Sequence, residues 1–135
     1  MHRVQQDKPE RLRMTIWNLG SINADFVYSV SHLPASGETL ASTDRAVFLG
    51  GKGANVSVAA ARAAARVAHI GAVGADGRWA VERLTEYGVD TRHIAEIDVE
   101  TSQAIIAVDV NGENSIILHQ GANVRIPIYL LEPVS

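Results

Sequence analysis

Two glycine-containing polar segments hold the residues that could bind a small ligand, and the first is residues 20–25 (GSINAD). Asn23 and Asp25 are two positions apart, so their side chains point to the same face of an extended chain. An amide and a carboxylate together offer donors and several acceptors, which suits the hydroxyl groups of a sugar. An Asx-type turn that stabilises its own backbone is the competing interpretation, and the segment taken alone favours that turn.

The second segment, residues 50–55 (GGKGAN), has the glycines and the lysine of a phosphate-binding loop without their spacing. A Walker loop needs a hydroxyl residue after its lysine and an earlier glycine, where this sequence has Gly53 and Ala46. The dinucleotide fingerprint G-x-G-x-x-G also lacks its last glycine. A glycine turn remains, in which a ligand can reach backbone N–H groups beside Lys52 and Asn55. Polyol or anion binding and a plain turn into a helix are equally open interpretations.

Other patterns exclude several kinds of chemistry. The five histidines show no i, i+4 or H-x-H spacing, so the sequence predicts no metal site. No serine lies in a G-x-S-x-G elbow, which removes the usual basis for a hydrolase. Residues 74–76 (GAD) could present a catalytic aspartate, but a plain turn leading into a helix is the favoured interpretation.

The elements that would position these segments alternate between strand and helix. We expect a helix in the alanine-rich residues 56–65 and another at 79–87, where Trp79, Leu84 and Tyr87 share a face and Gly88 provides the stop. We expect strands at residues 15–20, 26–30, 66–73, 103–110 and 115–120, and one or two more within 39–49. The Asn111-Gly112 pair predicts a hairpin between the last two strands.

This order predicts an α/β fold with a parallel sheet covered by helices. The short strands near residues 26–49 and 103–120 do not fit the alternation, and they predict a separate antiparallel flap. Residues 1–13 are polar and without period, so we expect a flexible tail before a domain at residues 14–135.

Length and composition narrow the class of protein further. The chain has 135 residues, of which 47% are hydrophobic and 20% are charged, enough for one folded domain. Its net charge of −3 offers no basic surface for nucleic acid, and no apolar run is long enough to span a membrane. The absence of cysteine fits a reducing, cytoplasmic setting. Enzymes that bind a nucleotide and a second substrate usually need a longer chain.

Taken together, the motifs resemble the ribokinase/phosphofructokinase-B family of carbohydrate kinases, and the ribokinases among them most. The likeness runs from about residue 15 to residue 123 and departs from the family at Ala64, where glycine is common. It rests on residues 20–25, 34–39 (PASGET), 50–55, 73–77 (VGADG), 87–90 (YGVD) and 121–123 (GAN), which follow one another in the family's order.

The resemblance implies a ribokinase-like α/β domain with a small β-sheet lid over a sugar, most simply ribose. Family members transfer the γ-phosphoryl group of ATP to a sugar hydroxyl with Mg²⁺ and often K⁺. Asn23 and Asp25 would bind ribose hydroxyls, and Ala104 and Ile106 would line the apolar side of the lid. The remaining residues that the resemblance assigns to the sugar pocket are Gly51, Lys52, Asn55 and Glu132.

The family's catalytic Gly-Ala-Gly-Asp motif does not occur in this sequence, so we expect a truncated, sugar-recognising N-terminal portion that is inactive alone. Residues 129–134 resemble the family's next core strand, which ends at Glu132. Only residues 124–128 precede it, although a parallel crossover needs a dozen residues or more, so a helix is expected to be missing.

The alternatives to a ribose kinase are another sugar or nucleoside kinase of the family, or a non-catalytic sugar-binding or assembly module. In each case we expect a homo-oligomer that forms through the lid or through an open sheet edge.

Overall fold

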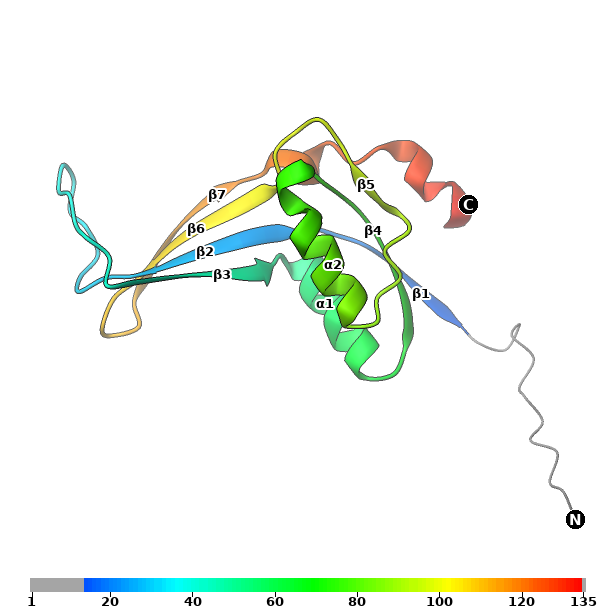
Figure 1. Cartoon of the computed structure of the whole chain (residues 1–135), viewed down its shortest axis with the longest axis horizontal. Coiled ribbons are helices and arrows are strands. Elements are labelled where there is room, and N and C mark those ends of the chain that lie inside the picture. Colours follow the sequence, from blue (N-terminus) through cyan, green and yellow to red (C-terminus); the bar gives the residue numbers. More distant parts are fainter. Residues whose placement is uncertain (1–13, 135) are drawn as a thin grey trace, which may run out of the picture.

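The computed structural model describes residues 14–134, which form two sheets and two helices with short 3-10 segments. Strands β1 (Thr15–Leu19), β4 (Arg66–Val73) and β5 (Ile94–Glu96) make a parallel sheet in the order β1-β4-β5. Strands β2, β3, β6 and β7 make a second sheet in the order β3-β2-β6-β7, which extends away from the helices (Figure 1). Their bounds are β2 Asn23–Ser29, β3 Asp44–Gly50, β6 Ser102–Val108 and β7 Asn114–His119.

Helices α1 (Lys52–Arg62) and α2 (Arg78–Glu86) cover one face of the parallel sheet. The core there consists of fully or almost fully buried apolar side chains, which are Ile22, Ala54, Val67, Val73, Ala80, Leu84 and Val89. Two small residues of α1, Ala54 and Ser57, are completely buried, so the helix lies close to β4. Leu84 carries the buried face of α2 as expected, but Tyr87 is 39% exposed because it lies beyond the last turn and faces Arg62.

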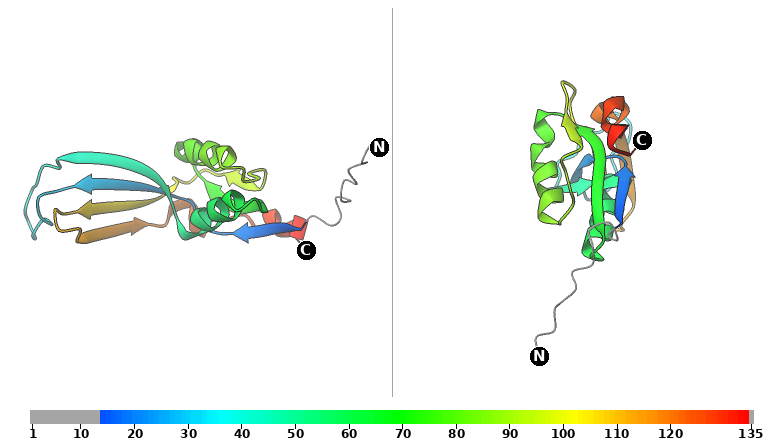
Figure 2. Two further views of the ribbon diagram at one scale, coloured as in Figure 1. Left: turned by 90° about the horizontal axis from the view of Figure 1, so that it is seen from below. Right: turned by 90° about the vertical axis from the view of Figure 1, so that its right-hand side faces the viewer.

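The end of the described chain runs along the other side of β4 from α2 (Figure 2). Segments η3 (Gly121–Val124) and η4 (Ile128–Val134) both contact β4, and Leu130 of η4 is buried. The prediction of a strand at residues 129–134 is therefore wrong. The physical reason is the short connection after η3, which cannot carry the chain across the sheet to lie parallel with β1.

The second sheet is mixed, so the prediction of a purely antiparallel flap is also wrong. Strand β2 pairs antiparallel with β3 but parallel with β6, with Asn23 opposite Ser102. The parallel pair forms because β2 and β6 leave the helical layer side by side and in the same direction (Figure 2). Strands β6 and β7 form the predicted hairpin, which turns through Gly112 at φ 80°.

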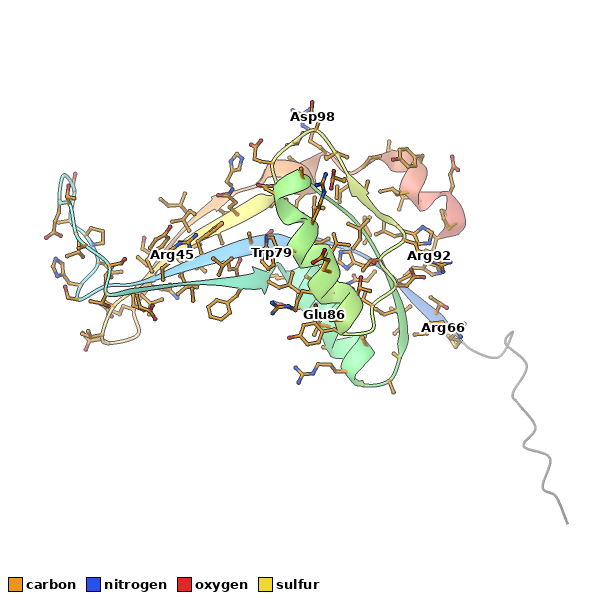
Figure 3. The ribbon with its side chains drawn as sticks, in the orientation of Figure 1. Arg45, Arg66, Trp79, Glu86, Arg92 and Asp98 are labelled. Atoms are coloured by element: carbon orange, nitrogen blue, oxygen red, sulfur yellow. The ribbon has the colours of Figure 1, made fainter. Side chains whose placement is uncertain are left out.

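One face of this sheet carries a cation–aromatic cluster. The guanidinium of Arg45, which is labelled in Figure 3, lies 5.2 Å from the ring centroid of Phe26 and 5.9 Å from that of Tyr28. Strand alternation puts Asn23 and Asp25 on the opposite face. The two faces therefore differ in chemistry, and the polar residues of the first ligand segment lie away from the cluster.

Other elements differ in extent from the sequence expectations. Helix α1 begins at Lys52 instead of residue 56, and β2 begins at Asn23 instead of residue 26. Residues 39–49 contribute the single strand β3, which begins only at Asp44. Strand β5 was not predicted, because three residues are too few to show a period.

Helix α1 ends in a Schellman arrangement with alanine at the position that usually holds glycine. The N–H of Ala65 donates to the carbonyl of Ala60 at 3.0 Å, and the N–H of Ala64 donates to that of Ala61 at 3.0 Å. Ala64 adopts φ 64°, the one positive φ of a non-glycine residue in the described part of the chain. A side chain in this left-handed region costs roughly 1–2 kcal/mol.

We predict that Ala64→Gly raises the free energy of unfolding by about 1 kcal/mol, because glycine removes this backbone strain. Urea denaturation of the wild type and the variant measures the change. The matched control is Ala63→Gly at φ −84°, where glycine relieves nothing and lowers stability by about 0.5–1 kcal/mol. Equal destabilisation by both substitutions would contradict the strain at Ala64.

Candidate functional site

The segment after β1 and the first turn of α1 meet backbone to backbone. A Cβ on Gly20 would lie 2.6 Å from the Cα of Gly53, so the contact leaves no room for a side chain. The N–H of Ala54 donates to the carbonyl of Ser21 at 2.9 Å, and the N–H of Gly53 donates to its hydroxyl at 3.3 Å. Gly51 has φ 90°, and a Cβ there would lie 2.8 Å from the carbonyl oxygen of Ser21. The glycines therefore join the two candidate ligand segments.

Two hydrogen bonds of Asn123 join the start of β2 to the segment after β7. The side-chain amide of Asn123 donates from Nδ2 to Oδ1 of Asn23 at 2.8 Å. The Oδ1 atom of Asn123 in turn accepts the backbone N–H of Ile22 at 2.9 Å. Residues about a hundred positions apart in the sequence thus lie together, and Asn123 fixes the orientation of the Asn23 amide.

Asp25 has the most unusual electrostatic environment of the predicted site residues. Its carboxylate lies directly against the Cα of Gly50, in the space that a side chain at position 50 would need. The Oδ1 atom is buried and has no hydrogen-bond partner in the described part of the chain. Burial raises the pKa of this carboxyl above its ordinary value. A ligand that donates hydrogen bonds would compensate for this loss of solvation.

The register of the four-stranded sheet places the apolar neighbours of Asp25. Phe48 lies opposite Asp25 on β3, and Ala104 lies opposite it on β6. Ala104 is in turn opposite Leu118 of β7. These residues form one row across the sheet on the same face. Ile106 belongs to the next row outward, opposite Val27, so it lies farther from the two ligand segments.

A cleft of about 300 Å³ opens between the ligand segments and the end of the hairpin. Its lining residues are Ser21, Asn23, Lys52, Leu118, Gln120, Asn123 and Val124. The structure therefore brings Asn23 and Lys52 together at the cleft, whereas the other predicted residues Asp25, Gly51, Ala104 and Ile106 are not among its lining residues. Asn55 is exposed and lines a neighbouring cleft of about 330 Å³ between β3 and the two helices, with Arg62 and Arg83. The two clefts flank the start of α1.

Two other acidic residues that the sequence brought forward, Glu132 and Asp76, line neither of these clefts. Glu132 is exposed on η4. Asp76, in η2 (Ala75–Gly77), accepts the backbone N–H of Thr101 at Oδ1 over 2.9 Å. Asp76 thus holds the turn before α2 against the chain that enters β6, which supports the interpretation of residues 74–76 as a plain turn.

Between residues 14 and 134, no group of three or more His, Asp and Glu side chains is arranged to hold a metal ion. Among the helices in that same range, none is long and apolar enough to cross a membrane.

Sequence reasoning did not assign five of the residues that line the cleft, namely Ser21, Leu118, Gln120, Asn123 and Val124. Ser21 could have been found, because it lies within the first ligand segment. The others depend on the return of the hairpin to the start of β2, which no local pattern reports.

Comparisons with known proteins agree with this architecture. The model of the pfkB family carbohydrate kinases matches residues 15–127. The ribokinase of Haemophilus influenzae is 45% identical over 115 residues, which cover 83% of this chain and 38% of that protein. The ribokinase of Bacillus subtilis is 38% identical over 116 residues, covering 84% of this chain and 40% of that protein.

Solved structures give the same result. A ribokinase from Cryptococcus neoformans in complex with ADP matches with a TM-score of 0.74 and 40% identity, over 82% of this chain and 35% of that one. An Arabidopsis thaliana ribokinase complexed with ribose and ATP matches with a TM-score of 0.76 and 30% identity, over 83% and 38%. This chain thus spans less than half the length of these relatives. The ribokinase-like α/β fold is confirmed, and the chain belongs to the pfkB family of carbohydrate kinases.

Proposed function

We propose that this chain is the sugar-recognising portion of a ribokinase-like kinase and binds ribose between the ligand segments and the four-stranded sheet. The observation that carries the proposal is the buried Oδ1 atom of Asp25, which lacks a hydrogen-bond partner in the described part of the chain. A sugar hydroxyl donates a hydrogen bond, and such a bond to a carboxylate is worth more than one between neutral groups.

The surroundings of Asp25 suit the rest of a sugar. Asn23 and Asn123 present amide groups at one end of the cleft, and the ammonium of Lys52 adds a cationic donor. Ala104 and Leu118 continue the row of Asp25 with apolar side chains. Neighbouring strands are about 4.8 Å apart, so this row spans about 10 Å from Asp25 to Leu118, which accommodates a pentose. Hydroxyl groups and the C–H face of the sugar would thus meet different residues.

The role that we propose for this chain is to bind and orient the sugar, and to shield its reacting hydroxyl from water beneath the sheet. Relatives were crystallised with ADP, or with ribose and ATP. We infer ATP, Mg²⁺ and K⁺ for the complete family reaction. Between residues 14 and 134, no group of three or more His, Asp and Glu side chains is arranged to hold a metal ion, and we assign no residue of this chain to the Mg²⁺ of MgATP. We derive no step through the nucleotide.

A related substrate is the second candidate. A deoxyribokinase of Salmonella typhimurium is 34% identical over 113 residues. A deoxysugar is therefore the alternative ligand that we propose. A nucleoside kinase structure at 21% identity supports the fold alone. Ribose and 2-deoxyribose differ by a single hydroxyl, so comparing their dissociation constants with this chain distinguishes the two proposals. Thermal stabilisation by neither sugar would favour a non-catalytic assembly module.

We also propose a cytoplasmic location, on the strength of a sequence without cysteine, and self-association of the chain. In the described sheet β1 has a neighbour on one side only. Two of its side chains are largely exposed, Ile16 at 46% and Leu19 at 53%. An apolar strand with a free edge pairs readily with another chain, and the four-stranded sheet presents two more edges at β3 and β7.

We predict that Asp25→Ala raises the dissociation constant for ribose roughly 10- to 100-fold, because it removes charge-assisted hydrogen bonds worth about 1.5–3 kcal/mol. Isothermal titration calorimetry measures the constant. The melting temperature should not fall, because the variant also removes a buried acceptor that has no partner in residues 14–134.

Asp44→Ala is the matched control. Asp44 lies on the same face at the far end of β3, opposite Ser29, and is exposed. This control should leave the dissociation constant unchanged. An equal effect of both variants would show that net charge, and not the position of Asp25, controls binding.

A further expectation is that the 135-residue chain alone forms no ADP from ATP in the presence of ribose. The reason is that its sequence lacks the Gly-Ala-Gly-Asp motif that supplies the catalytic base in the family. A coupled ADP assay on homogeneous protein, with a heat-inactivated sample as control, measures the activity. Ribose-dependent turnover above that control would overturn this part of the proposal.

Self-association gives another prediction. Multi-angle light scattering at micromolar concentration should give a mass above the 14.5 kDa of one chain. Ile16→Lys should reduce that mass, because a charge on β1 opposes strand pairing. Ile128→Lys serves as the control, since it adds the same charge at an exposed position of η4. A monomeric wild type would contradict both proposed routes of association.

A further inference from the structure

A hydrogen-bonded network of three polar side chains, two of them fully buried, runs beneath the two ligand segments. It begins at Asn18 of β1, whose Nδ2 atom donates to the carbonyl of Gly53 at 2.8 Å and to Oγ of Ser57 at 2.9 Å. Oγ of Ser57 lies 2.7 Å from Nδ1 of His69, and Nε2 of His69 lies 3.0 Å from the carbonyl oxygen of Gly20. Ser57 and His69 are both fully buried.

The chemistry of the partners fixes the direction of each hydrogen bond. A carbonyl oxygen only accepts, so Nε2 of His69 carries the hydrogen that is donated to Gly20. In the neutral imidazole Nδ1 is then an acceptor, so it receives the hydroxyl hydrogen of Ser57. Burial lowers the pKa of His69, which keeps the ring neutral near pH 7. The two amide hydrogens of Asn18 complete the network without leaving a donor unused.

The two ends of this network are the carbonyl groups of Gly20 and Gly53, the residues whose backbones touch at the cleft. Ser21 follows Gly20 in the sequence, and Lys52 precedes Gly53, and both line the cleft. The three side chains, from β1, α1 and β4, therefore hold by hydrogen bonds the backbone carbonyls next to two lining residues of the cleft.

We propose that Asn18, Ser57 and His69 are positioning residues of the sugar cleft, which hold residues 20–23 against residues 51–53 in the geometry that binds the ligand. The proposal rests on the proposed function for the identity of the ligand. Its structural part, that the three side chains hold the two segments together, is independent of any ligand.

Core packing alone does not require three polar groups at these positions. Replacing all the partners of a buried hydrogen-bonded set by apolar groups of similar shape costs little stability, whereas removing one partner leaves the others unsatisfied. The triple variant Asn18→Leu, Ser57→Ala and His69→Phe makes such a replacement among the three side chains. It removes the hydrogen bonds from Asn18 to the carbonyl of Gly53 and from His69 to the carbonyl of Gly20.

Amide hydrogen exchange measures the contact between the segments without a ligand. In the triple variant the N–H of Ala54, bonded to Ser21, should exchange at least tenfold faster than in the wild type. The N–H of Asp90, bonded to the carbonyl of Val67 at 2.9 Å, lies outside the two segments and should keep its rate. Unchanged exchange at Ala54 in the folded triple variant would overturn the proposal.

Ribose binding gives the second measurement. The triple variant should bind ribose about tenfold more weakly than the wild type. The control Val67→Ala, at a buried position of the same strand as His69, should lower stability and leave the dissociation constant unchanged. If Val67→Ala weakened ribose binding as much as the triple variant does, the three residues would have only a structural role, and the proposal would fail. If the wild type binds no ribose, the proposed function fails, and exchange at Ala54 still decides whether the network holds the segments together.

The ring of His69 provides a test that is measured on the wild-type chain. Nitrogen-15 NMR of the wild-type chain should show the ring of His69 as neutral and in the Nε2–H tautomer at pH 7, with its signals assigned by their loss in His69→Phe. A protonated ring or the Nδ1–H tautomer would contradict the direction of the hydrogen bonds, and with it the proposal, even if the triple variant failed to fold.

Discussion

The backbone contact between Gly20 and Gly53 is the constraint on which the rest of the molecule depends. It brings the end of β1 against the start of α1, and so joins the three-stranded sheet to the four-stranded one. The hydrogen bond from the N–H of Ala54 to the carbonyl of Ser21 stabilises the contact directly. Asn18 and His69 stabilise it further by hydrogen bonds to the carbonyls of Gly53 and Gly20. A side chain at either glycine would separate the segments that line the cleft.

The same contact explains why Asp25 can be buried without a partner in the described part of the chain. Strand β2 leaves the contact between β3 and β6, so the Asp25 side chain lies between Phe48 and Ala104 and against Gly50. A carboxylate in this position costs stability, and its raised pKa reflects the same loss of solvation. Natural sequences accept such a cost where a ligand repays it, which makes Asp25 the centre of the proposed site.

The sequence predicted the elements whose signals are local. Strand β4 reads as a continuous apolar run, and Asn111-Gly112 marks the hairpin. The parallel pairing of β2 with β6 was not predicted, because it joins residues about eighty positions apart in the sequence. His69 was considered only as a metal ligand, although a histidine within the apolar run of β4 is the signal of a buried hydrogen-bonded ring. Its partners Asn18 and Ser57 depend on how α1 packs against β1 and β4, which spacing alone does not encode.

If the joined segments form a sugar-binding cleft, a titration of the isotope-labelled chain with ribose, followed by amide NMR, will locate the sugar. We expect shifts of the amide signals of residues 21–25, residues 51–55 and Asn123, all of which saturate together. The amide signals of β5, which lies at the far side of the parallel sheet, should stay in place. Signals that do not move at millimolar ribose, or that move only outside these segments, would contradict the account.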